Sequence, residues 1–251
     1  EVSGDLDWLS IAMSETGKYI TCVGVYKIGV SQDTGQSWVE YATPTSGFPQ
    51  GSAVSANGMF QAVCSDTPTG GIHISSEYGS AWVITSAPEA NYLGICMSAD
   101  GLVMFAVYPD GVYRSVDYGV NWESVYTSSN LLKIAVSDDG QTVAAISSTA
   151  NSGLHRSLDL GVTWVDLTHS FDGFERGVAM SADGSRVTVC TSAKVYVLKD
   201  FKDVTPTFLT HVGLPLSFVY YDVSMSNTGE KQILATEDGA YTSLDYGLNW
   251  A

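Results

Sequence analysis

The sequence predicts an all-β fold, a six-bladed β-propeller of four-stranded antiparallel blades, and two repeated patterns carry this prediction. The first is Ser-x-Asp-x-Gly-x-x-Trp, called the octet below, in which Glu77 once replaces the Asp. Its five copies span residues 31–38, 75–82, 115–122, 157–164 and 243–250. The second is a Ser-x-x-Gly turn at residues 14–17, 55–58, 98–101, 137–140, 181–184 and 226–229. Internal repeats of ~40 residues are typical of propeller blades.

Each repeat contains four strand-like segments. A short segment with a small central residue, such as Ile95–Met97, precedes the Ser-x-x-Gly turn, where Gly supplies the positive φ of a tight hairpin. A β-rich run follows, as in 103–107, and then a third strand, as in Gly111–Arg114. The octet turns the chain, and a fourth strand leaves from its Trp, as in Trp122–Tyr126. No segment shows helical periodicity of useful length.

The repeats define one domain over residues 1–251. The expected blades are 8–48, 49–89, 90–130, 131–174, 175–219, and 220–251 together with 1–7. If Glu1 followed Ala251, Trp250 would precede Ile11 by 12 residues, as Trp122 precedes Ile134. We therefore expect the N-terminal strand to complete the last blade and close the ring, which removes exposed strand edges.

The fifth repeat lacks a complete octet. Residues 198–208 keep Asp200 at the Asp position, but the Gly and the Trp are missing. Phe201 or Phe208 is expected to fill the space that the Trp occupies in the other repeats.

Composition excludes several classes of partner. The net charge is -16, from 27 acidic and 11 basic residues, so binding to nucleic acid or to an anionic membrane surface is not expected. No apolar run approaches the ~18 residues of a membrane span. The four cysteines, Cys22, Cys64, Cys96 and Cys190, lack metal-ligand spacing and are interpreted as buried free thiols, with a Cys64–Cys96 bridge as the pairing to check. A chain that begins at Glu1 is either a processed protein or one domain of a longer one.

The octet resembles the Asp-box, or BNR repeat, of sialidases, sortilin-type receptors, xyloglucan-cleaving glycosidases and photosystem II assembly factors. The resemblance implies a propeller whose octets lie at the rim, away from the usual site. In this interpretation the carboxylate accepts hydrogen bonds from its own turn, the Gly takes a special backbone angle and the Trp is buried between sheets. The residues given this structural role are Asp33, Glu77, Asp117, Asp159, Asp245, Trp38, Trp82, Trp122, Trp164 and Trp250.

Residues just before each innermost strand are expected to crowd the mouth of the central channel. They are Trp8, Gln50, Tyr92, Lys133, Glu175, Arg176, Tyr220, Tyr221 and Asp222. Aromatic rings with a few charged groups suit sugar binding, whereas the alternative interpretation is that Trp8, Tyr92 and Tyr220 only cap the packing of the ring. The segment 168–176 is either a recognition loop or an ordinary surface loop. His169 and His211 are isolated and carry no predicted chemistry.

These patterns predict a non-enzymatic binding or adhesion module for a glycan or a surface protein. The sialidase arginine triad is not expected, because Arg114, Arg156 and Arg186 lie away from the mouth, and the Arg-Ile-Pro motif is missing. Two alternatives remain: a hydrolase or lyase that uses Asp7, Glu175 or Asp222, and a protein-interaction scaffold. No cofactor or metal is expected. The predicted location is extracellular, cell-surface or virus-surface.

Overall fold

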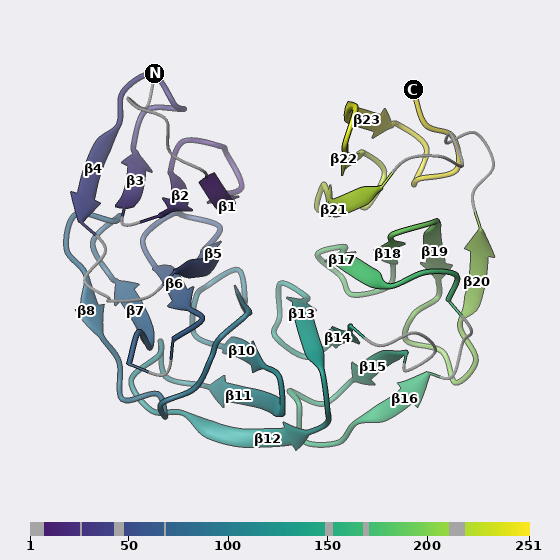
Figure 1. Ribbon diagram of the computed structural model, residues 1–251, viewed down its shortest axis with the longest axis horizontal. Helices are drawn as coiled ribbons and strands as arrows, with labels where there is room; N and C mark the ends of the chain where they lie inside the picture. The colour runs from purple at the N-terminus through teal and green to yellow at the C-terminus, as the bar shows by residue number, and fades with distance from the viewer. Residues whose placement is uncertain are drawn as a thin grey trace. The chain divides into compact units, whose positions relative to one another are not determined.

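The structure is a computed structural model that describes residues 8–25, 27–42, 48–67, 69–148, 153–167, 171–210 and 219–251. Every regular element in these ranges is a β-strand (Figure 1), so none of them contains a helix that could cross a membrane. The strands form six antiparallel sheets in chain order, which confirms the predicted all-β, six-bladed propeller class. The expected pairing of residues 1–7 with the last blade lies outside the described residues.

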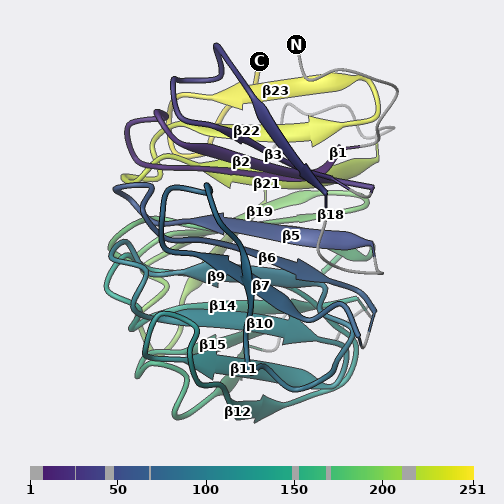
Figure 2. The ribbon, with the colours of Figure 1, turned by 90° about the vertical axis from the view of Figure 1, so that its left-hand side faces the viewer.

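The chain divides into two compact units, residues 1–128 and 129–251, and each contains three blades. The strands of the first unit are β1 (Trp8–Met13), β2 (Ile20–Gly24), β3 (Lys27–Ser31), β4 (Val39–Ala42), β5 (Pro49–Val54), β6 (Gln61–Ser65), β7 (Ile72–Ser75), β8 (Val83–Ile84), β9 (Gly94–Met97), β10 (Met104–Tyr108), β11 (Gly111–Ser115) and β12 (Glu123–Thr127). Figure 2 shows β5, β6 and β7 of one blade running side by side.

The second unit repeats this order. Its strands are β13 (Leu131–Val136), β14 (Val143–Ser147), β15 (Leu154–Ser157), β16 (Val165–Leu167), β17 (Glu175–Met180), β18 (Val187–Thr191), β19 (Val195–Lys199), β20 (Thr207–Thr210), β21 (Tyr220–Met225), β22 (Gln232–Thr236) and β23 (Gly239–Ser243). The last blade has three described strands. Ala251 exchanges two 2.9 Å backbone hydrogen bonds with Thr242, so the final residue takes the first position of a fourth strand.

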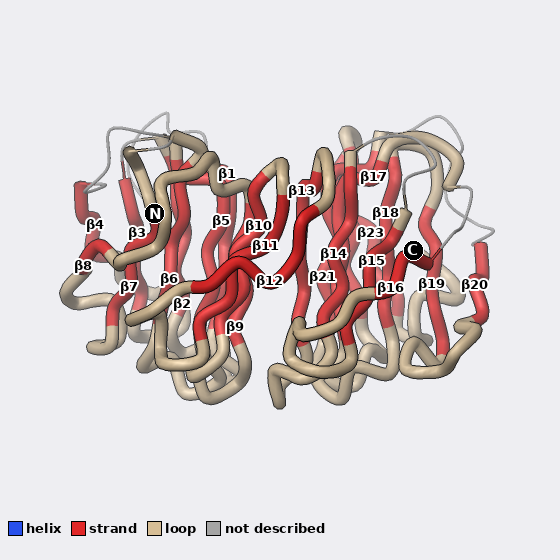
Figure 3. The backbone as a smooth tube through the Cα atoms, turned by 90° about the horizontal axis from the view of Figure 1, so that it is seen from below, coloured by secondary structure: helices blue, strands red, loops and turns tan. Residues whose placement is uncertain are grey.

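Antiparallel order places the connections of each blade at two opposite ends. The Ser-x-x-Gly turns and the octets lie at one end, called the octet end. The loops between the second and third strands, and the connections to the next blade, lie at the other, called the loop end. Figure 3 shows strands flanked by turns at both ends. Within a unit, the loops of neighbouring blades therefore lie together at the loop end, and their turns lie together at the octet end.

The core of each unit comes from the middle strands. All five residues of β6, β14 and β18 are buried, including Val63, Ile146 and Val189. A strand covered on both faces needs a nearly continuous apolar sequence, which explains why these runs do not alternate. The outer strands are exposed, as Val83 and Ile84 of β8 show.

The Ser-x-x-Gly turns have the predicted geometry. In each turn the Gly N–H donates to the Ser carbonyl at 2.8 or 2.9 Å, and the Gly φ lies between 69° and 80°. The glycines are also needed for packing between blades. A Cβ on Gly58 would lie 2.2 Å from the Tyr19 ring of the preceding blade, and one on Gly101 would lie 2.8 Å from Phe60. Backbone hydrogen bonds link successive turns within the first unit, from Glu15 to Ala56 and from Ala56 to Ala99.

Candidate functional site

The octet carboxylates are used within their own turns. Oδ1 of Asp33, Asp117, Asp159 and Asp245 accepts the backbone N–H four residues on at 2.8 or 2.9 Å. Oδ2 accepts the side chain of that same residue at 2.6 Å. The octet Ser hydroxyl donates to Oδ1 and accepts the Gly N–H. These carboxylates therefore act as structural acceptors.

These contacts also keep the octet carboxylates ionised. A hydrogen bond from the Ser37 side chain lowers the pKa of Asp33, and the Asn121 backbone N–H lowers the pKa of Asp117. The Asn249 side chain lowers the pKa of Asp245 in the same way. A general acid must hold a proton near neutral pH, so these groups are unsuited to acid catalysis. Glu77 differs: among the described residues none donates a hydrogen bond to its carboxylate.

The octet backbone contains a feature that the sequence did not reveal. The residue before the Gly also has a positive φ, between 56° and 64° in Thr34, Tyr78, Tyr118, Leu160 and Tyr246. Two successive positive φ values define a type I′ turn, whose twist matches that of a hairpin. Because bulky residues occupy the first position, the octet holds a strained conformation through its side-chain hydrogen bonds.

The octet Trp side chains are less buried than expected. Only Trp250 is buried, at 8% exposure, whereas Trp38, Trp82, Trp122 and Trp164 are partly exposed. Each indole N–H donates to the octet Gly carbonyl at 2.9 to 3.1 Å. The Trp ring therefore lies against its own turn, and Trp82, Trp122 and Trp250 also pack on the core clusters of their units.

The incomplete fifth octet is held by a residue of the preceding blade. The Phe201 N–H donates to the Ser185 carbonyl at 2.8 Å, as the fourth octet residue does elsewhere, so Asp200 does occupy the Asp position. The buried Arg156 guanidinium donates to the carbonyls of Phe201 and Asp203 at 2.5 Å each. It also lies 5.7 Å from the centroid of the Phe201 ring. Phe201 is fully buried, and Phe208 packs partly buried against the same cluster.

At the loop end, a bulge separates buried from accessible residues. The register shifts after the first residue of β1, β5, β13, β17 and β21. We call that first residue the slot residue and the next one the bulge residue. Four slot residues are buried and the fifth, Trp8, is partly exposed, whereas the bulge residues are exposed or, in Gln50 and Leu132, partly exposed.

Burial divides the residues predicted to line the mouth. Tyr92, two residues before β9, and Tyr220, the slot residue of β21, are 0% and 1% exposed and offer no surface to a ligand. The Tyr92 hydroxyl donates to the Pro88 carbonyl at 2.6 Å, and burial raises its pKa. Glu175, the slot residue of β17, is 1% exposed. These three side chains belong to the interior of their units.

The accessible part of the predicted set in the second unit lies on adjacent strand ends. The bulge residues Arg176 and Tyr221 are exposed, Tyr221 at 52%, and Lys133 and Asp222 follow the bulges of β13 and β21. In the first unit Trp8 is partly exposed, and the Gln50 amide donates to Asp66 at 2.9 Å. An aromatic ring and charges of both signs are thus available at the loop end of the second unit.

Gly177 provides the space in which Asp222 sits. A Cβ on Gly177 would lie 2.4 Å from Oδ1 of Asp222 and 2.9 Å from Sγ of Cys190. The Asp222 side chain reaches solvent, but the strand ends enclose it closely, and this desolvation raises its pKa while the Lys133 charge partly offsets the rise. The Val223 N–H donates to Oδ1 at 2.9 Å. Asp222 and Lys133 therefore interact electrostatically at the loop end.

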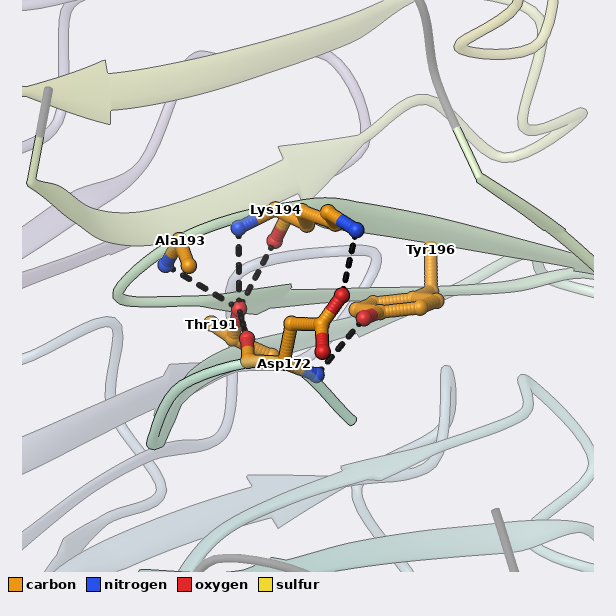
Figure 4. Close-up of polar contacts among 5 residues, drawn as sticks. All are labelled: Asp172, Thr191, Ala193, Lys194 and Tyr196. Atoms are coloured by element: carbon orange, nitrogen blue, oxygen red, sulfur yellow. Dashed lines mark hydrogen bonds and ion pairs between the residues drawn. The ribbon is translucent and has the colours of Figure 1, made fainter. Parts of the chain in front are cut away.

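Hydrogen bonds and an ion pair join the connection that leads into β17 to the residues around the β18–β19 loop (Figure 4). The Tyr196 hydroxyl accepts the Asp172 N–H at 2.7 Å, and the Thr191 hydroxyl donates to the Asp172 carbonyl at 2.6 Å. The Asp172 carboxylate pairs with the Lys194 ammonium. Residues 171–176 of the predicted recognition loop are therefore ordered by local contacts, whereas residues 168–170, with His169, lie outside the described residues, as do His211 and Asp7.

No disulfide joins any of the four cysteines, so the Cys64–Cys96 bridge is not formed. Cys22, Cys64 and Cys190 are buried, and Cys96 is partly exposed. Burial raises the pKa of Cys22 to about 11 and also raises the pKa of Cys190, so neither is an activated thiolate. Within the described ranges, no group of His, Cys, Asp and Glu side chains is arranged to hold a metal ion.

Comparison with solved structures finds the same fold. YCF48 from Cyanidioschyzon merolae matches 100% of this chain and 86% of its own, with a TM-score of 0.75 and 13% identity. YCF48 bound to a D1 peptide matches 98% of this chain and 81% of its own, with a TM-score of 0.71 and 16% identity. The GH74 xyloglucanase from Xanthomonas campestris gives a TM-score of 0.76 at 14% identity. The likeness is one of fold alone.

Two facts limit what these neighbours imply. The chain covers 46% of the xyloglucanase, so it spans less than half of that enzyme. No family model matches the sequence, and no curated protein matches it either. Folds of this kind support unrelated activities, so the function of this chain depends on its accessible side chains, such as those at the loop end.

Proposed function

We propose that this chain is a non-enzymatic binding module that takes a glycan at the loop end of its second unit. The observation that carries the proposal is the accessible group formed by Lys133, Arg176, Tyr221 and Asp222 at the starts of adjacent inner strands. A sugar ring can stack on the exposed face of Tyr221 while the charged groups bind its hydroxyls, an arrangement that combines apolar contact with polar specificity.

The distribution of carboxylates supports binding over hydrolysis. Glycoside hydrolysis generally uses two carboxyl groups that flank the scissile bond. Of the predicted acids, Asp222 is accessible, Glu175 is buried, and Asp7 lies outside the described residues. A binding role needs only one accessible carboxylate. A glycan ligand also fits the proposed extracellular, cell-surface or virus-surface location.

A glycan array with the intact chain tests the proposal. We expect Arg176→Ala and Tyr221→Ala each to weaken binding to the strongest hit at least tenfold without lowering the melting temperature. The matched control is Leu132→Ala, at the bulge position of the neighbouring strand β13, which should bind like the wild type. An array without hits contradicts glycan binding. Turnover of a polysaccharide that is lost in Asp222→Asn would instead establish the hydrolase alternative.

A protein-interaction scaffold is the second candidate. It is favoured by the whole-length similarity to YCF48, which has been solved with a bound D1 peptide. Arg176, Asp222 and Tyr221 could equally contact a peptide, because exposed aromatic and Arg side chains are common anchors of protein interfaces. Capture of one defined protein from the native source, lost in Arg176→Ala and retained in Leu132→Ala, would support the scaffold.

A further inference from the structure

One slot residue is chemically different from all the others. The slot positions of β1, β5, β13 and β21 hold Trp8, Pro49, Leu131 and Tyr220, and Tyr92 stands at the corresponding place before β9. In β17 the slot residue is Glu175. A carboxyl group therefore occupies a place between blades that apolar or aromatic side chains fill elsewhere. Buried polar groups that break such a local rule call for an explanation in terms of function.

The surroundings of Glu175 stabilise a negative charge only in part. Both of its carboxyl oxygens are buried, and no side chain of the described residues donates a hydrogen bond to either oxygen. Desolvation raises its pKa, and the backbone N–H groups of Glu175 itself and Gly153 only partly offset this effect. No charged side chain of the described residues contributes to the change in the Glu175 pKa. Among the described titratable groups, the Tyr196 phenol is the one whose pKa the Glu175 charge affects, and burial raises the pKa of that phenol.

Several contacts hold the segment that leads into the slot, including those of Thr191 and Lys194 with Asp172, and two of them involve backbone amides that can report its opening. The Ser192 N–H donates to the Phe174 carbonyl at 2.7 Å, and the Asp172 N–H donates to the Tyr196 hydroxyl at 2.7 Å. Phe174 is 53% exposed, and Arg176 is exposed on the other side of Glu175. Glu175 is thus a buried residue between two exposed ones, Phe174 and Arg176. If its side chain left the slot, both exposed residues would move with it.

We propose that Glu175 is a proton-operated latch, neutral while it sits in the slot, and that loss of its proton to solvent releases the start of β17 together with Phe174 and Arg176. An ionised carboxylate that has no buried cation beside it is much more stable in water than in the packing between blades. The latch therefore couples the position of surface residues at the loop end to pH.

The direction of the pH dependence follows from linkage. The pKa of Glu175 is raised in the docked state and returns toward the ordinary value of about 4.3 when the side chain reaches water. Docking is therefore fully stabilised below the ordinary pKa and weakens as pH rises through the docked pKa. Between the two values the population of the released state grows up to about tenfold per pH unit, and it levels off above the docked pKa.

Hydrogen exchange of the intact chain tests the latch without any ligand. The reporters are the amides of Ser192 and Asp172, with protection factors corrected for intrinsic exchange at each pH from 4 to 9. We expect their protection in the wild type to fall by up to about tenfold per pH unit and then level off. The Asp66 amide, which donates to the Phe48 carbonyl at 3.1 Å beside the Pro49 slot, is the internal control and should not change with pH.

Two variants decide whether Glu175 is responsible. Glu175→Gln keeps the shape without a titratable proton, and Glu175→Leu copies the Leu131 slot of β13. Both should show pH-independent protection at Ser192 and Asp172. Constant protection in the wild type, or the same pH dependence in Glu175→Gln, overturns the proposal. An effect of pH on glycan binding would follow only if the proposed function also holds, so failure of binding leaves the exchange result intact as a separate test.

Discussion

Replacing Arg156 with alanine tests whether one side chain of the fourth blade stabilises the incomplete octet of the fifth. The guanidinium donates to two carbonyls, those of Phe201 and Asp203, and lies near the Phe201 ring. Because Arg156 is 6% exposed, the substitution leaves these carbonyls without their donor and opens space beside a fully buried ring. The octet of the fifth blade already lacks its Gly and Trp, and the substitution also removes the hydrogen bonds that Arg156 donates to this turn.

The magnitude follows from these contacts. Each hydrogen bond from a charged donor contributes about 1.5–3 kcal/mol, and the cation–π contact adds about 0.5–1 kcal/mol. Burial of the guanidinium opposes them, as the lowered pKa of Arg156 shows, with desolvation as the largest cause. We expect Arg156→Ala to lower the free energy of unfolding by about 3–5 kcal/mol. For a chain of this size that corresponds to a fall in melting temperature of roughly 6–20 °C.

The assay is urea and thermal unfolding of the full chain beside a matched control. Arg114 occupies the same position on β11, and its side chain, 13% exposed, pairs with Glu123, whose side chain is 59% exposed, so that water reaches the pair on the Glu123 side. Arg114→Ala should therefore cost only about 1 kcal/mol. Arg156→Lys, which keeps the charge but not the planar fork, should fall between the two. Equal losses in Arg156→Ala and Arg114→Ala would refute this account of the fifth blade.

Three further predictions concern the turns and the thiols. Asp117→Ala should cost about 1 kcal/mol in urea unfolding at pH 7, whereas Glu77→Ala should cost almost nothing, and equal losses would contradict the proposed role of the octet Asp. Because the pKa of Asp117 is lowered, its contribution is complete above the ordinary Asp value of about 3.9 and is lost as pH falls through the lowered pKa. Gly101→Ala, at a φ of +77° with its Cβ 2.8 Å from Phe60, should cost about 2–4 kcal/mol, and adding Phe60→Ala should recover part of that loss. Cys190 should react with a thiol reagent at pH 8 only after unfolding; fast labelling of the native chain would show that it is accessible.

Much of the fold could be predicted because the same residue types recur wherever the same turn recurs. The glycines of the Ser-x-x-Gly turns have the positive φ that the sequence suggested, and the octet aspartates accept hydrogen bonds from their own turns. The position before the octet Gly was not foreseen, since Tyr118 and Leu160 rarely adopt a positive φ. Side-chain hydrogen bonds within the octet impose that conformation, and residue type alone does not reveal it.

The candidate site was predictable only in part. The sequence placed Tyr220, Tyr221 and Asp222 together at the start of a strand, but it could not separate the buried Tyr220 from the exposed Tyr221. The bulge in β21 makes that separation, because one extra residue shifts the faces of the residues around it. The role of Arg156 was also hidden, since its partners lie 45 and 47 residues away.

By itself, the sequence determined the number of blades, the order of the strands and the turns that join them, because these depend on local patterns that recur in every repeat. Only the tertiary structure decided which side chains reach water at the loop end, that the Glu175 carboxyl group is buried without a charged partner among the described residues, and that Arg156 donates hydrogen bonds to the incomplete fifth octet. Those facts depend on packing between neighbouring blades, which brings together residues that no local pattern connects.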